Sequence, residues 1–301
     1  MDLYLPIAGL SVNIFVIIGL GALVGILSGM FGVGGGFLTT PLLIFYGIPP
    51  AVAVASAATQ ITGASVSGVF AHGRRGGVDF VMGTVLVVGG AIGSLSGGVA
   101  FRALQDSGQI DTVVGLLYVF LLGGIGVLMA REAIGSLVAM WRGEPVAART
   151  KRHHKLLAAL PLRWRFYASG LYISPLALGF VTGLLTVLMG VGGGFLLVPA
   201  MIYLLGKSTR VVVGTSLFQI LFVTAATTLV HATTTKAVDI VLAVLLLIGS
   251  VTGAQVGARF AQTVKPEYLR LFLAFIVLVV AIRMALGLGW RPDEIYTVQP
   301  L

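Results

Sequence analysis

Ten apolar stretches, separated by short polar or glycine-rich intervals, dominate the chain. Five precede a basic interval and five follow it, and they span roughly 9–31, 36–48, 51–72, 80–104, 110–140, 171–190, 194–206, 209–232, 238–263 and 267–289. A helix needs about 20 apolar residues to cross about 30 Å of hydrocarbon, and most of the stretches reach that length. The pattern predicts an all-α polytopic membrane protein.

The second and seventh stretches are too short to cross a bilayer as straight helices. About 13 residues of helix rise only about 20 Å. Each of these stretches also follows a run of glycines, which interrupts a helix because glycine has no side chain to restrict its backbone. We therefore expect two broken or re-entrant helices, and the sequence leaves open whether they cross fully.

The second half of the chain repeats the first. The string Gly-Val-Gly-Gly-Gly-Phe-Leu occurs at 32–38 and again at 190–196, inside a longer match between 21–41 and 179–199. The match continues at a nearly constant offset with three polar pairs: Gln60 and Gln219, His72 and His231, Asp79 and Asp239. Chance similarity between apolar helices would not keep these residues in register, so the chain contains an internal duplication of five segments each.

The composition excludes a soluble domain and indicates how the chain is oriented. Hydrophobic residues make up 57% of the chain and charged residues only 10%, whereas soluble domains average roughly 25% charged. The net charge of +9 gathers in loops, where basic side chains mark the cytoplasmic side of a membrane protein rather than a nucleic-acid surface. Equivalent loops of the two halves differ in basic content, so we expect the second repeat to be inverted.

Four regions follow from this division. We expect a first transmembrane repeat at 1–141, a basic cytoplasmic linker at 142–170, a second, inverted repeat at 171–290 and a short tail at 291–301. Because 142–165 is strongly basic, we expect the linker inside the cell and both termini outside. The lipid bilayer is an expected partner, nucleic acid is not, and a homodimer is an open expectation.

The duplicated glycine clusters are the most specific candidate site. Before each short apolar arm stand three consecutive glycines: Gly34, Gly35 and Gly36 in the first half, and Gly192, Gly193 and Gly194 in the second. Free backbone N–H groups and the helix dipole at such a terminus favour an anion. Inverted symmetry would bring the two termini towards one point. Close helix packing explains the outer glycines of the clusters equally well, and neither cluster forms a P-loop, because neither has the Gly-x-x-x-x-Gly-Lys-Ser/Thr spacing.

Polar side chains inside the apolar spans are further candidates for lining the site. Gln60 and Gln219 occupy equivalent places, and an amide is costly to bury in lipid without a function. A neutral amide can donate to an anion's oxygens without a cation in the membrane. Ser and Thr in such helices often bond only to their own backbone. The nearby hydroxyls are those of Ser56, Thr59, Thr215 and Ser216, and weaker candidates are Ser28 and Thr186.

His72 and His231 lie at segment ends where water is expected, and either could titrate near neutral pH and support proton coupling. Interfacial contacts with headgroups or loop carbonyls explain them equally well. Asp79 and Asp239 are expected to cap helices. The chain has no cysteine and no spaced set of metal ligands, so we expect no metal site, no cofactor and no catalytic residues.

The duplicated Gly-x-Gly-Gly-Gly-Phe-Leu-x-x-Pro motif, with the downstream Gln and His, resembles the TauE/SafE family of sulfite and organosulfonate exporters. The resemblance covers roughly 15–105 and 172–288. It implies a bacterial inner-membrane transporter for small sulfur-containing anions, such as sulfite, sulfoacetate or related sulfonates. The termini would then be periplasmic.

The repeats, the broken helices and the resemblance together predict a secondary transporter that exports such an anion by alternating access. An anion channel of the same architecture stays open, as does an uptake permease for another small oxyanion such as thiosulfate. An intramembrane enzyme is disfavoured because the carboxylates sit at span edges. A cation transporter is disfavoured because it would want acidic residues at the midplane.

Overall fold

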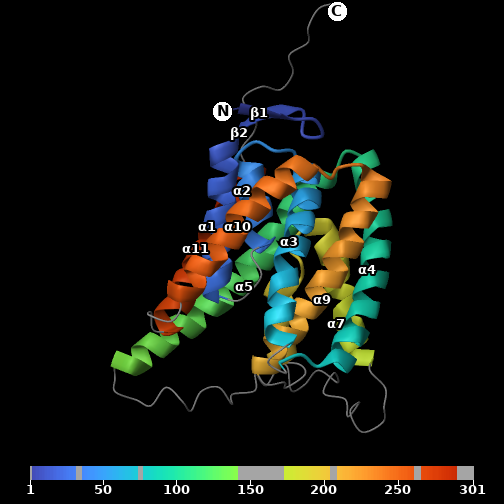
Figure 1. Ribbon diagram of the computed structural model, residues 1–301. Coiled ribbons are helices and arrows are strands. Elements are labelled where there is room, and N and C mark those ends of the chain that lie inside the picture. The colour runs from blue at the N-terminus through green and yellow to red at the C-terminus, as the bar shows by residue number, and fades with distance from the viewer. Residues whose placement is uncertain are drawn as a thin grey trace, which may run out of the picture.

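The computed structural model describes residues 2–31, 36–73, 77–141, 173–203, 209–260 and 266–289. Helices dominate this part of the chain and occupy the ten predicted stretches (Figure 1). In the first half they are α1 (Ile14–Phe31), α2 (Gly36–Phe45), α3 (Pro50–Gly73), α4 (Phe80–Asp106) and α5 (Ile110–Trp141). In the second half they are α7 (Ile173–Met189), α8 (Gly194–Tyr203), α9 (Thr209–Val230), α10 (Ile240–Phe260) and α11 (Pro266–Gly289). The predicted all-α membrane fold is confirmed.

The N-terminal segment differs from the prediction. β1 (Asp2–Leu5) and β2 (Leu10–Asn13) form an antiparallel hairpin whose turn contains Gly9 at a φ of +68°. The expected apolar stretch begins at residue 9, whereas α1 begins five residues later, where the Asn13 side chain accepts a hydrogen bond from the Phe15 N–H at 3.1 Å. A short apolar run cannot by itself distinguish a strand from a helix, and here the Asn cap sets the boundary.

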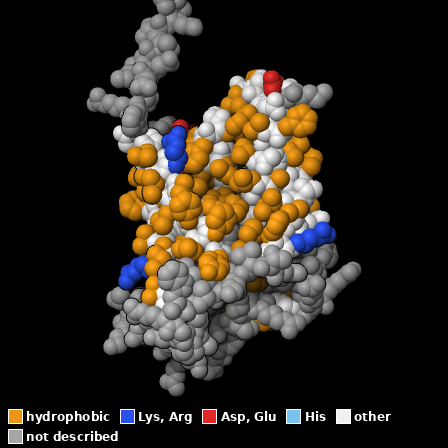
Figure 2. Space-filling view, turned by 90° about the vertical axis from the view of Figure 1, so that its left-hand side faces the viewer, with side chains coloured by type: hydrophobic (Ala, Val, Ile, Leu, Met, Phe, Trp, Pro, Cys, Tyr) orange, Lys and Arg blue, Asp and Glu red, His pale blue; other side chains and the backbone are white. Residues whose placement is uncertain are grey.

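Within the described ranges, five helices are long and apolar enough to cross a membrane: α4, α5, α9 with its continuation, α10 and α11. By contrast, α2 and α8 have ten residues each and rise only about 15 Å, so neither can cross alone. Hydrophobic side chains cover the face shown in Figure 2, with charged side chains towards its margins. Val99 and Phe120 leave 74% and 76% of their surface exposed, which suits contact with lipid rather than water.

The two halves of the chain exchange helices. α1 packs along α10 and α4 packs along α7, so the first helix of each half contacts the fourth helix of the other. Glycines make these contacts close. A Cβ on Gly25, Gly253, Gly93 or Gly183 would lie under 3.0 Å from a backbone oxygen of the facing helix. Helix packing therefore accounts for these four glycines.

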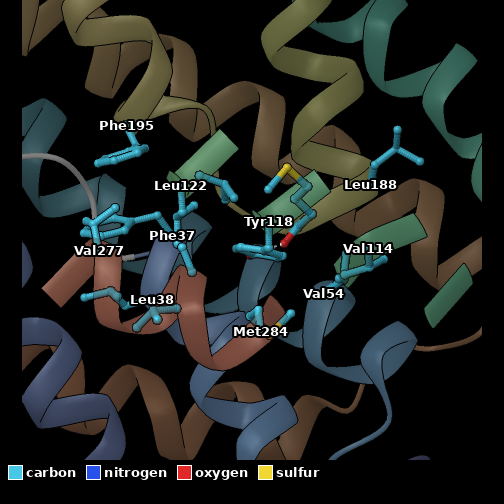
Figure 3. Packing of buried hydrophobic residues seen from close by; sticks show 14 of the residues in the cluster. Phe37, Leu38, Val54, Val114, Tyr118, Leu122, Leu188, Phe195, Val277 and Met284 are labelled. Atoms are coloured by element: carbon cyan, nitrogen blue, oxygen red, sulfur yellow. Dashed lines mark hydrogen bonds between the residues drawn. The ribbon is translucent and has the colours of Figure 1, made fainter. Parts of the chain in front are cut away.

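The largest buried cluster joins α2, α5, α8 and α11, and Phe37, Tyr118, Phe195 and Val277 belong to it (Figure 3). Phe37 and Phe195, equivalent residues of the two glycine motifs, stack with their ring centroids 4.5 Å apart and an interplanar angle of 15°. If a two-fold axis relates the halves, equivalent residues can touch only near that axis. The starts of α2 and α8 therefore meet inside the core.

Candidate anion site at the glycine breaks

The break between α7 and α8 is made of glycines in a backbone conformation that other residues avoid. Gly190, Gly192 and Gly193 have φ values of +70°, +74° and +75°, in the left-handed region. α8 begins at Gly194, and its first turn bonds back to the Gly193 carbonyl. Within the described part of the chain, the hydrogen bonds found leave the N–H groups of 192–194 without an acceptor. The buried break thus presents backbone donors at the positive end of α8.

The corresponding break of the first half lies partly outside the described residues. Gly34 and Gly35 fall there, whereas Gly36 begins α2. A Cβ on Gly36 would lie 2.6 Å from the Val191 carbonyl oxygen, so the start of α2 touches the break of the second half. This contact and the stacked phenylalanines bring the N-terminus of α2 to the break that precedes α8.

Gln219 on α9 is fully buried and lies beside Gly193. Its Nε2 donates to Thr182 Oγ1 on α7 at 3.3 Å, while its Oε1 has no hydrogen-bond partner among the described residues. A Cβ built on Gly193 would lie 3.8 Å from that Oε1 and 3.5 Å from Thr186 Oγ1. The unpaired amide oxygen therefore faces the glycine break. A buried polar atom is costly in this state unless a ligand or a water meets it.

A second unpaired atom lies at the other end of the same break. Thr40 Oγ1 on α2 is buried and has no partner in hydrogen-bond geometry among the described residues. A Cβ on Gly190 would lie 2.9 Å from this oxygen. Nearby, the Tyr118 hydroxyl on α5 donates to the carbonyl of Met189, the last residue of α7, at 2.6 Å. Both buried side-chain atoms found unpaired in the described structure thus border one glycine break.

Gln60 on α3 is buried like its counterpart Gln219, but its neighbours satisfy its amide. Nε2 donates to Ser250 Oγ on α10 at 2.8 Å, and Oε1 accepts from Thr39 Oγ1 on α2 at 3.5 Å. The residue after Gln60 contacts the break, since a Cβ on Gly192 would lie 3.0 Å from Ile61 Cγ2. The two glutamines are therefore unequal: Gln60 ties α3 to α2 and α10, and Gln219 keeps an open acceptor.

Ser56 and Thr215 bind the helix caps of the opposite half. The Ser56 hydroxyl accepts from the Asp239 N–H at 3.1 Å, and the Thr215 hydroxyl accepts from the Asp79 N–H at 2.9 Å. Each aspartate carboxylate also accepts from the N–H three residues later, at 3.1 Å. The expected capping by Asp79 and Asp239 is confirmed, and the structure uses these two hydroxyls to join α3 to α10 and α9 to α4.

Thr59 and Ser216 bond to their own helices. The Thr59 hydroxyl contacts the Ala55 carbonyl at 3.0 Å, and the Ser216 hydroxyl donates to the Val213 carbonyl at 3.0 Å. This is the self-bonded alternative that the sequence left open for both residues. Thr59 also lies 3.3 Å from the Thr228 hydroxyl, which bridges α3 and α9.

His231 is fully buried, so its expected position at a water-facing segment end is wrong. α9 continues as a π-helical turn, His231–Thr235, which keeps the imidazole inside the bundle and edge-on to the Phe101 ring at 4.7 Å. One ring nitrogen lies 3.0 Å from the Val187 carbonyl and the other 3.1 Å from the Thr235 hydroxyl. The side chain of His72 lies outside the described residues, so proton coupling stays a prediction.

Thr40 and Thr182 border the break although the sequence does not single them out, and Thr186 ranks there only as a weak candidate. The sequence gives little sign that these threonines line a site, because a threonine in an apolar helix usually bonds to its own backbone. Only the packing of α7 and α2 against α9 and the break reveals which hydroxyls face inwards. The described residues contain no group of three or more His, Asp or Glu that could hold a metal ion.

Comparison with known proteins now decides the family. The family model described as "Sulfite exporter TauE/SafE" matches residues 17–284, which is most of the chain. The chain belongs to the TauE/SafE family. TauE/SafE proteins are membrane transporters, and the curated relatives carry matching names. A probable membrane transporter protein, YjnA, of Bacillus subtilis is 28% identical over 89% of this chain and 98% of its own length.

Two further relatives extend this TauE/SafE match to other organisms. A probable membrane transporter protein of Xylella fastidiosa is 27% identical over 93% of this chain and 96% of its own length. Another, from Methanocaldococcus jannaschii, is 25% identical over 88% of this chain and 93% of its own length. No solved structure matches this TauE/SafE chain significantly.

Proposed function

We propose that this TauE/SafE transporter exports a small sulfur-containing anion, such as sulfite or an organosulfonate, across the bacterial inner membrane. The observation that carries the proposal is the break before α8, where backbone N–H groups and the Gln219 oxygen, all without a hydrogen-bond partner among the described residues, border one buried place. The description of the matching family as a sulfite exporter supports the substrate class.

The site suits a small anion because it binds without a buried cation. A lysine or arginine in the middle of a membrane helix costs about 2.5–3.5 kcal/mol on insertion scales. A helix N-terminus instead offers roughly half a positive charge and N–H groups that are already oriented. We place the anion against Gly192, Gly193 and Gly194, with 34–36 as the counterpart from the first half. Gln60 and Gln219 flank it.

The exchange of helices between the halves supports alternating access. α1 starts at the end of the molecule that carries the hairpin, and α7 starts at the opposite end (Figure 1), which supports an inverted second repeat. In inverted-repeat transporters one repeat rocks against the other around a site formed by broken helices. The glycine break, with its left-handed residues, is the place in this fold where such a motion would meet the substrate.

Export of an anion needs no nucleotide in this proposal. The chain contains no complete Gly-x-x-x-x-Gly-Lys-Ser/Thr motif for ATP, because the run Gly206-Lys207-Ser208 has Met201 where the motif needs its first glycine. A membrane potential that is negative inside favours outward movement of an anion by about 2.3 kcal/mol per charge per 100 mV. We place the basic linker at 142–170 in the cytoplasm and both termini in the periplasm, as its positive charge favours.

Reconstitution into proteoliposomes tests the proposal. We expect wild-type protein to carry sulfite or sulfoacetate, with counterflow. The double variant Gln60→Ala with Gln219→Ala should lose at least about tenfold of that flux, since the Gln219 amide borders the break and the Gln60 amide holds α3 against α2 and α10. Size-exclusion profiles show whether the variant still folds, and Gly124→Ala, with no heavy atom within 4 Å of the new Cβ, is the control. Unchanged flux in the folded double variant would remove both glutamines from the site. Large currents without counterflow would indicate a channel instead.

A further inference from the structure

Gln219 presents its oxygen to the glycine break, and the reason lies in its neighbour on α7. The Thr182 hydroxyl has one hydrogen, which it donates within its own helix to the Gly179 carbonyl at 2.9 Å or the Leu178 carbonyl at 3.0 Å. Thr182 Oγ1 can therefore only accept from the amide, and it does so from Gln219 Nε2. With the nitrogen held on this side, Oε1 points to Gly193.

The second side-chain oxygen at this end of the break is also an acceptor. Thr186 donates its hydroxyl hydrogen to the Thr182 carbonyl at 2.6 Å, so its oxygen turns only lone pairs towards Gly193. The backbone N–H groups of Gly192, Gly193 and Gly194 are donors. One small buried place therefore combines backbone donors with two side-chain acceptors, one of which is unpaired.

We infer that the break binds an anion that itself carries an O–H or N–H donor, its charged oxygens on the backbone N–H groups and its donor on Gln219 Oε1. This inference rests on the proposed function and narrows its substrate class. Hydrogensulfite, and sulfonates with a hydroxyl or ammonium group, have this chemistry. A fully deprotonated anion without a donor would leave Oε1 buried and unpaired, or turn its own lone pairs against it.

The inference predicts a preference between two sulfonates that differ by one hydroxyl, isethionate and ethanesulfonate. We expect isethionate to halve sulfite flux into proteoliposomes at a concentration at least about tenfold lower than the concentration of ethanesulfonate that does so. Ethanesulfonate has no hydroxyl to donate to Gln219 Oε1, and an unsatisfied buried acceptor weakens binding by about that factor. Gln219→Leu removes the acceptor, so isethionate and ethanesulfonate should then halve the sulfite flux at similar concentrations. Gly124→Ala, outside the site, should keep the wild-type preference.

A second arm tests hydrogensulfite itself. At fixed total sulfite and equal pH on both sides, flux should fall from mildly acidic to mildly alkaline pH as the dianion replaces hydrogensulfite. That fall should be reduced in Gln219→Leu, and protein-free liposomes correct for passive leakage. Preference for isethionate without the pH effect assigns the site to donor-bearing sulfonates, and the pH effect without that preference assigns it to hydrogensulfite.

The failures of the inference and of the proposed function can be told apart. If sulfite moves but its flux ignores pH, and both sulfonates compete equally in the wild type, the inference is overturned and the proposed function stands. If neither sulfite nor any sulfonate moves, both are overturned. The sulfonate preference and the pH dependence are both measured on the wild type. The inference can therefore be overturned even if the Gln219→Leu protein does not fold.

Discussion

Valine in place of Gly253 should prevent α1 from packing on α10 and leave little folded protein to purify. A Cβ at this position would lie within 3.0 Å of the carbonyl oxygen, the carbonyl carbon and the Cα of Ala22, backbone atoms that cannot rotate aside. Overpacking a core that can adjust costs about 1–3 kcal/mol, and a helix contact lined by glycines on both sides has less room to adjust. The yield of monodisperse protein in detergent and the midpoint of thermal unfolding measure the effect.

Gly124→Val is the matched control for this substitution. Gly124 also lies in an apolar helix, but no heavy atom lies within 4 Å of its would-be Cβ, so valine there should leave the yield and the midpoint unchanged. Gly93→Val, at the equivalent position on α4, should fail as Gly253→Val does, because its Cβ would meet the Phe180 carbonyl. A Gly253→Val protein that purifies with a wild-type unfolding midpoint would disprove the close contact between α1 and α10.

Gly193→Ala should abolish anion transport while the protein still folds. The added methyl group would lie 3.2 Å from Thr182 Cβ and 3.8 Å from Gln219 Oε1, in the place assigned to the anion. It would also force an alanine to a φ of +75°, which costs roughly 1–2 kcal/mol and favours a shift of the open N–H groups. We expect at least about a tenfold loss of sulfite flux, because about 1.4 kcal/mol of lost binding already weakens it tenfold.

Gly108→Ala separates the two effects of that substitution. Gly108, between α4 and α5, has a φ of +71°, and no heavy atom lies within 4 Å of its would-be Cβ. Alanine there carries a similar backbone strain without filling the site, so flux per folded protein should match the wild type. Equal losses in both variants would mean that strain alone reduces transport, and full flux in Gly193→Ala would place the anion elsewhere.

The helices could be predicted because lipid imposes a length and a composition on every span. All ten apolar stretches became helices, since in hydrocarbon the backbone has to satisfy its own hydrogen bonds. The hairpin could not be predicted in this way. Its strands are four residues long, and their burial depends on where 2–13 folds back over the end of the bundle.

The candidate site was predictable at its backbone and not at its side chains. The duplicated triple glycine predicts the break, because few other residues tolerate the φ values found at Gly192 and Gly193. Which atom of Gln219 faces the break depends on Thr182, thirty-seven residues earlier, and hence on the packing of α7 against α9. The burial of His231 depends likewise on a π-helical turn that no local pattern announces.

Locating the bound anion tests most directly whether the glycine break is the transport site. Selenite is a close chemical analogue of sulfite, and anomalous scattering from its selenium marks its position in crystals of the purified transporter. We expect one selenium peak at the break before α8, within hydrogen-bond reach of the N–H groups of 192–194 and beside the Gln219 amide. A peak elsewhere, with the glycine break unoccupied in protein that transports sulfite, would contradict this expectation.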